Sequence, residues 1–407
     1  MILILILLNA FVSWRYAIID IEPDFAMYLL WGQTGAKYGK DFIDCKMPLV
    51  HLLLKGISVI TKKNVAWTRA IFFFLTGLPS IIAYLITGNM GIALAFLVMI
   101  HSGWLLSFHG NVGDITAGLI FLALLIPNPW IFVILLVLAT LYEPKMIIAT
   151  APMILIRITS VWLPLVVVVA VCLIAIASIW YYKHDLWNWL IEGNWKITRR
   201  MQKYRKGLYP FMPYFTASAF VYLLPWLLVA VWFKPDILFW LPALLFLILS
   251  FTGWVIRPNH LLPLVAWIAA AGIPPVYVYA LSLTDFASSG FYLGNIWGRF
   301  YQGLRDAIKD SHAIGDFLKD KEGTLWVNCI HTEIYVWAGK KPQYGMTEQI
   351  ELDKLSWERR PYMIKQQKAH PADWIVSQEG KGRPFNYKDY YVTARSAYFV
   401  VWRRKAV

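Results

Sequence analysis

Charged residues and cysteines are scarce in this sequence, and each scarcity narrows the class of protein. Charged residues make up 15% of the 407 positions and hydrophobic residues 59%, whereas soluble domains are about 45–50% apolar. The three cysteines, Cys45, Cys172 and Cys329, are far apart without metal-ligand spacing, so they give no basis for a disulfide framework. The N-terminal segment lacks a basic region and a small-residue cleavage site, which favours a retained first membrane helix over a signal peptide.

Long apolar runs fill the chain before Asp285 and predict a polytopic α-helical membrane protein. A spanning helix needs about 20 apolar residues, and lipid offers backbone groups no partners outside a helix or a closed barrel. The runs are continuous rather than alternating, which favours helices. Candidate helices cover residues 1–19, 68–87, 90–108, 161–182, 212–233, 236–256 and 261–283. Prolines and charges interrupt 115–158, which predicts two or three shorter helices and a total of about nine to eleven.

Tryptophan and positive charge are abundant, and both suit a membrane protein. Many of the 21 Trp residues fall at or near the ends of candidate helices, where such side chains anchor helices at the headgroup level. The formal net charge of +14 fits topology signals and lipid phosphates better than nucleic acid in so apolar a chain. The basic cluster within 196–206 is open to both interpretations, a topology signal or a surface for anionic headgroups.

The pattern changes after Asp285, where polar and apolar residues mix as in a small soluble fold. The segments TLWVNCI, DWIVSQ and SAYFVVWRR predict strands. A helix is expected near 305–318, and the combination predicts a small C-terminal α/β domain. We therefore expect a transmembrane domain over residues 1–285, with a first loop over 20–66, and a soluble domain over 286–407.

The acidic residues of the membrane region concentrate in this first loop. Residues 1–285 contain 11 Asp and Glu, and five lie in the loop: Asp20, Glu22, Asp24, Asp41 and Asp44. Carboxylates are costly near a bilayer and tend to mark function there, although a loop is also an ordinary place for a charge. Asp24 begins a short amphipathic helix expected over 24–37, where it is either an N-cap or a general base. That helix, and another that opens at Pro48, are expected to lie on the membrane surface.

An ordered set of residues runs through the first loop. It comprises Pro23, Asp24, Tyr28, Gly39, Phe42, Asp44, Lys46 and Pro48. This order resembles the first extracytoplasmic loop of the GT-C glycosyltransferases. The nearest branch of that superfamily holds the protein O-mannosyltransferases and lipid A aminoarabinose transferase. Two positions depart from the pattern: Met47-Pro48 replaces paired prolines, and Glu22-Pro23-Asp24 replaces a directly adjacent acidic pair.

The resemblance continues along the chain. Asp114 lies where such proteins often carry a loop acid before a helix, and Lys145 in TLYEPKMIIATAP resembles their Lys-Pro loop. Arg257 and His260 in RPNHLLP resemble a segment in which the family has Tyr where this chain has Leu261. The C-terminal TLWVNCIHTEIYVWAGKKP is similar to their small soluble domain.

The resemblance implies a GT-C-like fold and a sugar transfer, with inversion, from a polyprenyl-phosphate donor. It implies that Asp24 removes the proton of the acceptor hydroxyl, and a positioned base contributes roughly 10²–10⁴-fold. Cations that stabilise the leaving phosphate would be Lys46, Lys145, Arg257 and His260. Helix-end snorkelling is the alternative for Lys145 and Arg257, and His260 is alternatively an ordinary interface histidine. Asp44 and Asp114 are the secondary acidic candidates.

The resemblance also implies where the protein lies and what it meets. We expect the plasma membrane, with the C-terminal domain extracytoplasmic, and a lipid, glycan or protein acceptor. No cofactor is established, and the altered acidic motif leaves a divalent metal open. Two other functions remain open. One is a transporter or flippase for a lipid-linked saccharide, which would need no base in the first loop. The other is a non-catalytic relative that acts as a structural subunit or partner of another enzyme.

Overall fold

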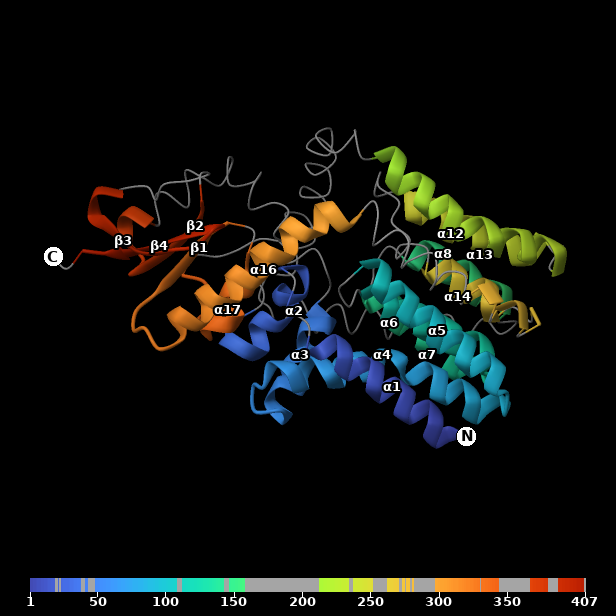
Figure 1. Cartoon of the computed structure of the whole chain (residues 1–407). Helices are drawn as coiled ribbons and strands as arrows, with labels where there is room; N and C mark the ends of the chain where they lie inside the picture. The colour runs from blue at the N-terminus through green and yellow to red at the C-terminus, as the bar shows by residue number, and fades with distance from the viewer. Residues whose placement is uncertain are drawn as a thin grey trace. The chain divides into compact units, whose positions relative to one another are not determined.

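Helices make up most of the described chain in the computed structural model, together with one small sheet (Figure 1), which confirms that part of the predicted fold. The structure describes residues 1–18, 21, 23–37, 41–42, 48–107, 112–142, 146–157, 212–233, 237–251, 262–270, 273–274, 276–278, 280–281, 297–329, 331–343, 367–379 and 387–405. The chain divides into two compact units. The first comprises Met1–Ile18, Arg69–Tyr181 and Arg205–Trp297, and the second Ile19–Thr68, Tyr182–Tyr204 and Gly298–Val407. The domain boundary expected at 285/286 lies outside the described residues.

The first unit is built from apolar helices. They are α1 (Ile2–Ala17), most of α4 (Val65–Thr87), α5 (Met90–Ser107), α6 (Val112–Leu125), α7 (Pro129–Tyr142), α8 (Ile147–Arg157), α12 (Met212–Phe233), α13 (Ile237–Phe251) and α14 (Leu262–Ala270). The predicted division of 115–158 is confirmed as α6, α7 and α8. Asn128 starts α7 by accepting the N–H of Trp130 over 2.9 Å, and Pro129 sits at the first helical position, where no N–H is needed. The helix expected over 161–182 lies outside the described residues.

Close helix contacts in this unit depend on aromatic rings and glycine. Phe96 of α5 stacks on Phe121 of α6 with ring centroids 3.9 Å apart. Gly118 of α6 lies against Pro79 of α4. A Cβ at position 118 would be only 2.8 Å from the proline Cγ, so this close approach requires glycine. Helix α6 also packs against α7 and α14. The core of the first unit therefore centres on α6 and its neighbours.

One helix among the described residues, α4, has both the length and the apolar composition of a membrane span. Shorter apolar helical segments of the described chain, such as Leu223–Phe233 within α12, have 10–17 residues. The expected total of nine to eleven spanning helices therefore stays a prediction.

The second unit joins the first loop to the C-terminal part of the chain. Its helices are α2 (Pro23–Thr34), α3 (Pro48–Ile60), α16 (Trp297–Lys319) and α17 (Glu333–Ala338), and its strands are β1 (Leu325–Asn328), β2 (Trp374–Gln378), β3 (Tyr390–Arg395) and β4 (Phe399–Arg404). A 3-10 turn over Tyr387–Asp389 leads into β3. The predicted strands are confirmed as β1, β2 and β4, and the helix expected near 305–318 as part of α16.

The sheet is mixed, with strand order β1-β2-β4-β3. Strands β1 and β2 are parallel, with Leu325 opposite Trp374, whereas β4 is antiparallel to both β2 and β3. Its core is formed by Trp326, Ala372, Ile375 and Tyr390, with Trp402 packed against them. Strand β3 was not expected from the sequence. Its pairing register with β4 shifts between Val392 and Ala394, which marks a bulge, and most of its residues are exposed.

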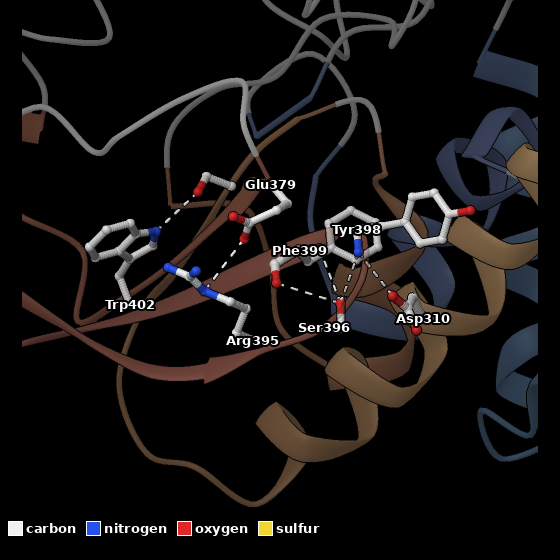
Figure 2. Close-up of polar contacts among 8 residues, drawn as sticks. Asp310, Glu379, Arg395, Ser396, Tyr398, Phe399 and Trp402 are labelled. Carbon is white, nitrogen blue, oxygen red and sulfur yellow. Dashed lines mark hydrogen bonds and ion pairs between the residues drawn. The ribbon is translucent and has the colours of Figure 1, made fainter.

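Figure 2 shows the polar contacts that hold the β3–β4 hairpin. The Ser396 hydroxyl accepts the N–H of Phe399 over 3.0 Å and so closes the turn. Asp310 of α16 accepts the N–H of Tyr398 over 3.2 Å, which ties the hairpin to that helix. Two further contacts join Trp402 to Ser377 over 3.0 Å and Arg395 to Glu379 over 3.6 Å. The hairpin is therefore fixed to both α16 and β2.

Candidate functional site

Helix α2 carries the candidate base and packs against α3 and α17 of the second unit. It begins at Pro23, a residue favoured at the first helical position because its fixed φ suits a helix. Asp24 is therefore the second residue of the helix rather than the N-cap. All residues from Phe25 to Gln33 are buried. The expectation of an amphipathic helix on the membrane surface was wrong for α2, because protein covers it on all sides.

The crossing of α2 and α3 is close because one residue has no side chain. A Cβ at Gly32 would lie 2.3 Å from the Ser58 Oγ of α3. The neighbouring Gln33 side chain donates to the hydroxyls of Ser58 over 3.2 Å and Thr68 over 3.3 Å. All three polar side chains are buried, and their mutual hydrogen bonds offset the cost of that burial. The close packing and these hydrogen bonds fix the position of α2 against α3.

Two residues of the loop motif meet at a buried histidine. His51 of α3 is fully buried, and its ring is edge-on to Tyr28 at 5.5 Å and to Phe42 at 5.3 Å between centroids. Asp24 and Tyr28 are four residues apart in α2, so they belong to one face of the helix. No role was predicted for His51, because nothing in its spacing indicated that it would contact these two aromatic residues.

The C-terminal domain covers α2 through α17, the short helix after β1. All but one of its six residues are buried. At its start, the Nδ1 of His331 lies 2.7 Å from the Glu333 Oε1, with 2% and 0% of these side chains exposed. The second carboxylate oxygen of Glu333 is buried without a hydrogen-bond partner. Such a buried polar pair is costly to break on one side only.

Helix α17 is in turn fixed to α16. The ring of His312 stacks on Trp337 with centroids 3.8 Å apart. A Cβ at Gly315 would lie 2.3 Å from the Cβ of Trp337, so the two helices touch at this glycine. The hydroxyl of Tyr335 accepts the N–H of Val327 over 2.7 Å, which joins α17 to β1. Helix α2 is thereby connected to the sheet through α17.

The structure places the predicted site residues as follows. Asp24 is in the first turn of α2, in the second unit, and Asp114 is the third residue of α6, in the first unit; the side chains of both lie outside the described part. The remaining candidates, Asp44, Lys46, Lys145, Arg257 and His260, lie outside the described residues. Within the described ranges, no group of three or more His, Cys, Asp and Glu side chains gathers as metal ligands do.

Sequence reasoning missed a buried arginine near the first loop. Arg69 of α4 has 5% of its surface exposed, and its Nη1 donates to the carbonyl oxygen of Ala17, the last residue of α1, over 3.0 Å. A cation is favourable at a helix C-terminus, where carbonyl groups lack partners. A lone arginine at the start of an apolar run was the available signal, since such a residue marks function or a specific partner.

Comparisons with protein-family models, with curated proteins and with solved structures find no match to this chain.

Proposed function

We propose that the first unit lies in a lipid bilayer. Its helices carry large apolar side chains on exposed faces, as in α12, where Leu224, Leu228 and Val231 follow helical spacing and Trp232 is 82% exposed. Exposed apolar residues on the other helices are Leu3, Ile4, Leu7, Leu8, Phe11, Trp14, Leu75, Leu85, Ile86, Trp130, Ile131, Ile134, Leu241, Leu244 and Ile248. Apolar patches of this extent are covered by lipid or by another protein.

The interior of the same unit supports this location. Small polar side chains are fully or almost fully buried in the apolar helices, namely Asn9, Ser13, Thr76, Ser80, Thr116 and Thr150. A helical bundle in lipid places polar side chains between its helices and apolar side chains on its outer surface. Four helices also carry an interior proline, at Pro79, Pro152, Pro225 and Pro242. Proline is more frequent in membrane helices than in soluble ones.

The proposed activity is that of a membrane glycosyltransferase, in which a sugar moves from a polyprenyl phosphate to an extracytoplasmic acceptor. The observation that carries it is the packing of α2 between α3 and α17 within one compact unit. The first loop and the C-terminal domain are far apart in sequence, yet they build a single body around the helix with Asp24 in its first turn. A transporter would not need a carboxylate in the first turn of such a helix.

In the proposed reaction the acceptor hydroxyl oxygen attacks the anomeric carbon of the sugar. The bond from that carbon to the phosphate oxygen breaks, and the polyprenyl phosphate leaves with the bonding electrons. Asp24 takes the hydroxyl proton, so charge and atoms balance. Inversion follows because attack and departure occur on opposite faces of the sugar. Cations stabilise the leaving phosphate, and the candidates are Lys46, Lys145, Arg257 and His260.

The test is sugar transfer from a polyprenyl-phosphate donor by purified wild type and Asp24→Asn. Asn cannot accept a proton at neutral pH, so we expect turnover to fall roughly 10²-fold or more. Thermal stability is measured alongside, because a first-turn carboxylate contributes only about 0.3–1 kcal/mol through the helix dipole. Asp41→Asn is the matched control. Its carboxylate accepts the N–H of Lys37 over 2.8 Å, and the amide oxygen of Asn accepts the same bond.

Each outcome selects among the functions. A stable Asp24→Asn variant without activity supports the base. Full activity in that variant assigns the chemistry to another carboxylate, with Asp44 and Asp114 next in order. If wild type transfers no sugar from any such donor, the enzyme proposal fails and the flippase or the non-catalytic subunit takes its place.

A further inference from the structure

Helix α3 has one apolar face that no described residue covers. Positions 52, 56, 59 and 60 are exposed and follow the spacing of a single helix face. Val59 is 71% and Ile60 77% exposed, among the highest values for large apolar residues of this chain. The opposite face, with Leu54, Ile57 and Ser58, is buried towards α2. The exposed face ends at the turn into α4.

That turn carries two adjacent lysines in an unusual backbone conformation. Lys62 and Lys63 have φ angles of 52° and 61°, the left-handed region that is unfavourable for residues other than Gly, Asn and Asp. Both side chains are exposed, and no shielding acid is near in sequence, since there is no Asp or Glu from Cys45 to Gly113. The N–H of Lys63 donates to the carbonyl oxygen of Ser58 over 2.7 Å, and the N–H of Lys62 to that of Val59 over 3.2 Å, so the two lysines close the C-terminal end of α3.

The position of the turn relative to the bilayer follows from α4. This helix begins at Val65 and has the length and composition of a membrane span. Trp67, in its first turn, is 55% exposed, as expected of an aromatic anchor at the headgroup level. The lysine turn therefore comes directly before the point where the chain enters the hydrocarbon.

We propose that the α3–α4 turn is a docking surface for the anionic headgroups of the bilayer. The face formed by Leu52, Val59 and Ile60 inserts among the acyl chains near the headgroups. Lys62 and Lys63 then contact lipid phosphates. A lysine beside an anionic surface favours an anionic lipid roughly fivefold, so the pair would select anionic over zwitterionic lipid. This inference rests on the membrane location proposed above, not on the glycosyltransferase activity.

The experiment uses the full chain with a photoreactive benzoylphenylalanine in place of Ile60. The protein is reconstituted in bilayers of phosphatidylcholine with one part in about three of phosphatidylglycerol, a composition that leaves the charge effect measurable, and crosslinked lipids are identified by mass spectrometry. We expect the ratio of phosphatidylglycerol to phosphatidylcholine among the crosslinked lipids to exceed their bulk ratio roughly three- to tenfold. In K62N/K63N the ratio should return to the bulk value. Asn tolerates the left-handed backbone, so this variant removes the charge without straining the turn.

A matched pair of lysines and two reference positions complete the design. K319N/K341N removes the same charge from exposed positions of the second unit and should keep the enrichment. The same crosslinker at Leu228 reports contact with acyl chains, and at Tyr391, a partly exposed strand residue, it should capture no lipid.

The outcomes separate this inference from the membrane proposal. Lipid capture at 60 and 228 without enrichment of phosphatidylglycerol overturns the anionic preference but leaves the membrane location. Capture at 228 and none at 60 overturns the docking surface alone. Capture at neither position overturns both. An equal loss of enrichment in K319N/K341N would assign it to the net charge of the protein instead of the turn.

Discussion

The side-chain amide of Asn9 in α1 donates a hydrogen bond to the carbonyl oxygen of Phe74 in α4 over 2.9 Å. Asn9 is fully buried among apolar neighbours. The space for its side chain comes from Gly77, where a Cβ would lie 2.0 Å from the Asn9 Oδ1. A small residue on one helix and a polar side chain on the other are common means of joining helices in lipid.

We expect Gly77→Ala to destabilise the first unit by about 1–3 kcal/mol, because the new methyl group collides with Asn9. Asn9→Ala should cost about 0.5–2 kcal/mol through the lost interhelical bond. In the double variant the collision is absent, so the two costs should be non-additive by about 1 kcal/mol or more. Thermal unfolding of the detergent-purified protein measures all three. Strictly additive costs would show that the two residues are not in contact.

The α2–α3 crossing gives a second prediction with a built-in control. Gly32→Ala places a methyl group 2.3 Å from the Ser58 Oγ, so it should cost about 1–3 kcal/mol of stability. Gly56, in α3, has nothing within 4 Å of its would-be Cβ. Gly56→Ala should therefore be neutral or stabilise the helix by up to about 1 kcal/mol.

Adding Ser58→Gly to the Gly32→Ala variant removes the atoms that collide and should restore part of the loss. The readout is again the thermal unfolding curve. Equal stability of the two alanine variants would contradict the close approach of α2 to α3.

The third prediction concerns alkaline pH. Burial raises the pKa of Tyr390 above its ordinary value, with smaller opposing contributions from Gln367 and Arg404. Its hydroxyl donates to the carbonyl of Ala372 over 2.6 Å and accepts from the Gln367 amide over 2.7 Å. The folded state therefore holds the proton more tightly than the unfolded chain. This contribution to stability is complete below about pH 10, the unfolded value, and is lost as pH rises through the higher folded value.

Tyr390→Phe should remove this pH dependence while lowering stability near neutral pH by about 1–2 kcal/mol, because Gln367 and Ala372 lose their partner. Chemical unfolding at pH 7.5 and at increments above pH 10 distinguishes the two variants. Parallel stability curves for wild type and Tyr390→Phe across the alkaline range would contradict the assignment.

Most helices and strands could be predicted, because each rests on a local signal. The apolar run 212–233 and the helix Met212–Phe233 coincide, and the three strands rich in Val, Ile and Trp were found. Strand β3 was missed, since its short, mostly exposed run of Tyr, Val, Thr and Ala lacks the apolar core signal and depends on pairing with β4.

The surroundings of the candidate site could not be predicted in the same way. Tyr, Gly, Gln and Thr make α2 look amphipathic in sequence, but α2 is buried and both α3 and α17 pack against it. Those contacts are set by tertiary packing between segments that are far apart in the chain. The proximity of His51 to Tyr28 and Phe42 also arises when the segments of the first loop pack together, whereas His331 and Glu333 are only two residues apart and meet locally.

The enclosure of α2 also has a consequence for biosynthesis. The ribosome makes α2 before α17, which follows about 300 residues later. At roughly 5–20 residues per second this delay is about 15–60 s. Throughout that interval the apolar residues of α2 lack one of their covering helices. A chain truncated before residue 333 would lack α17 and would leave the α2 residues that this helix covers exposed.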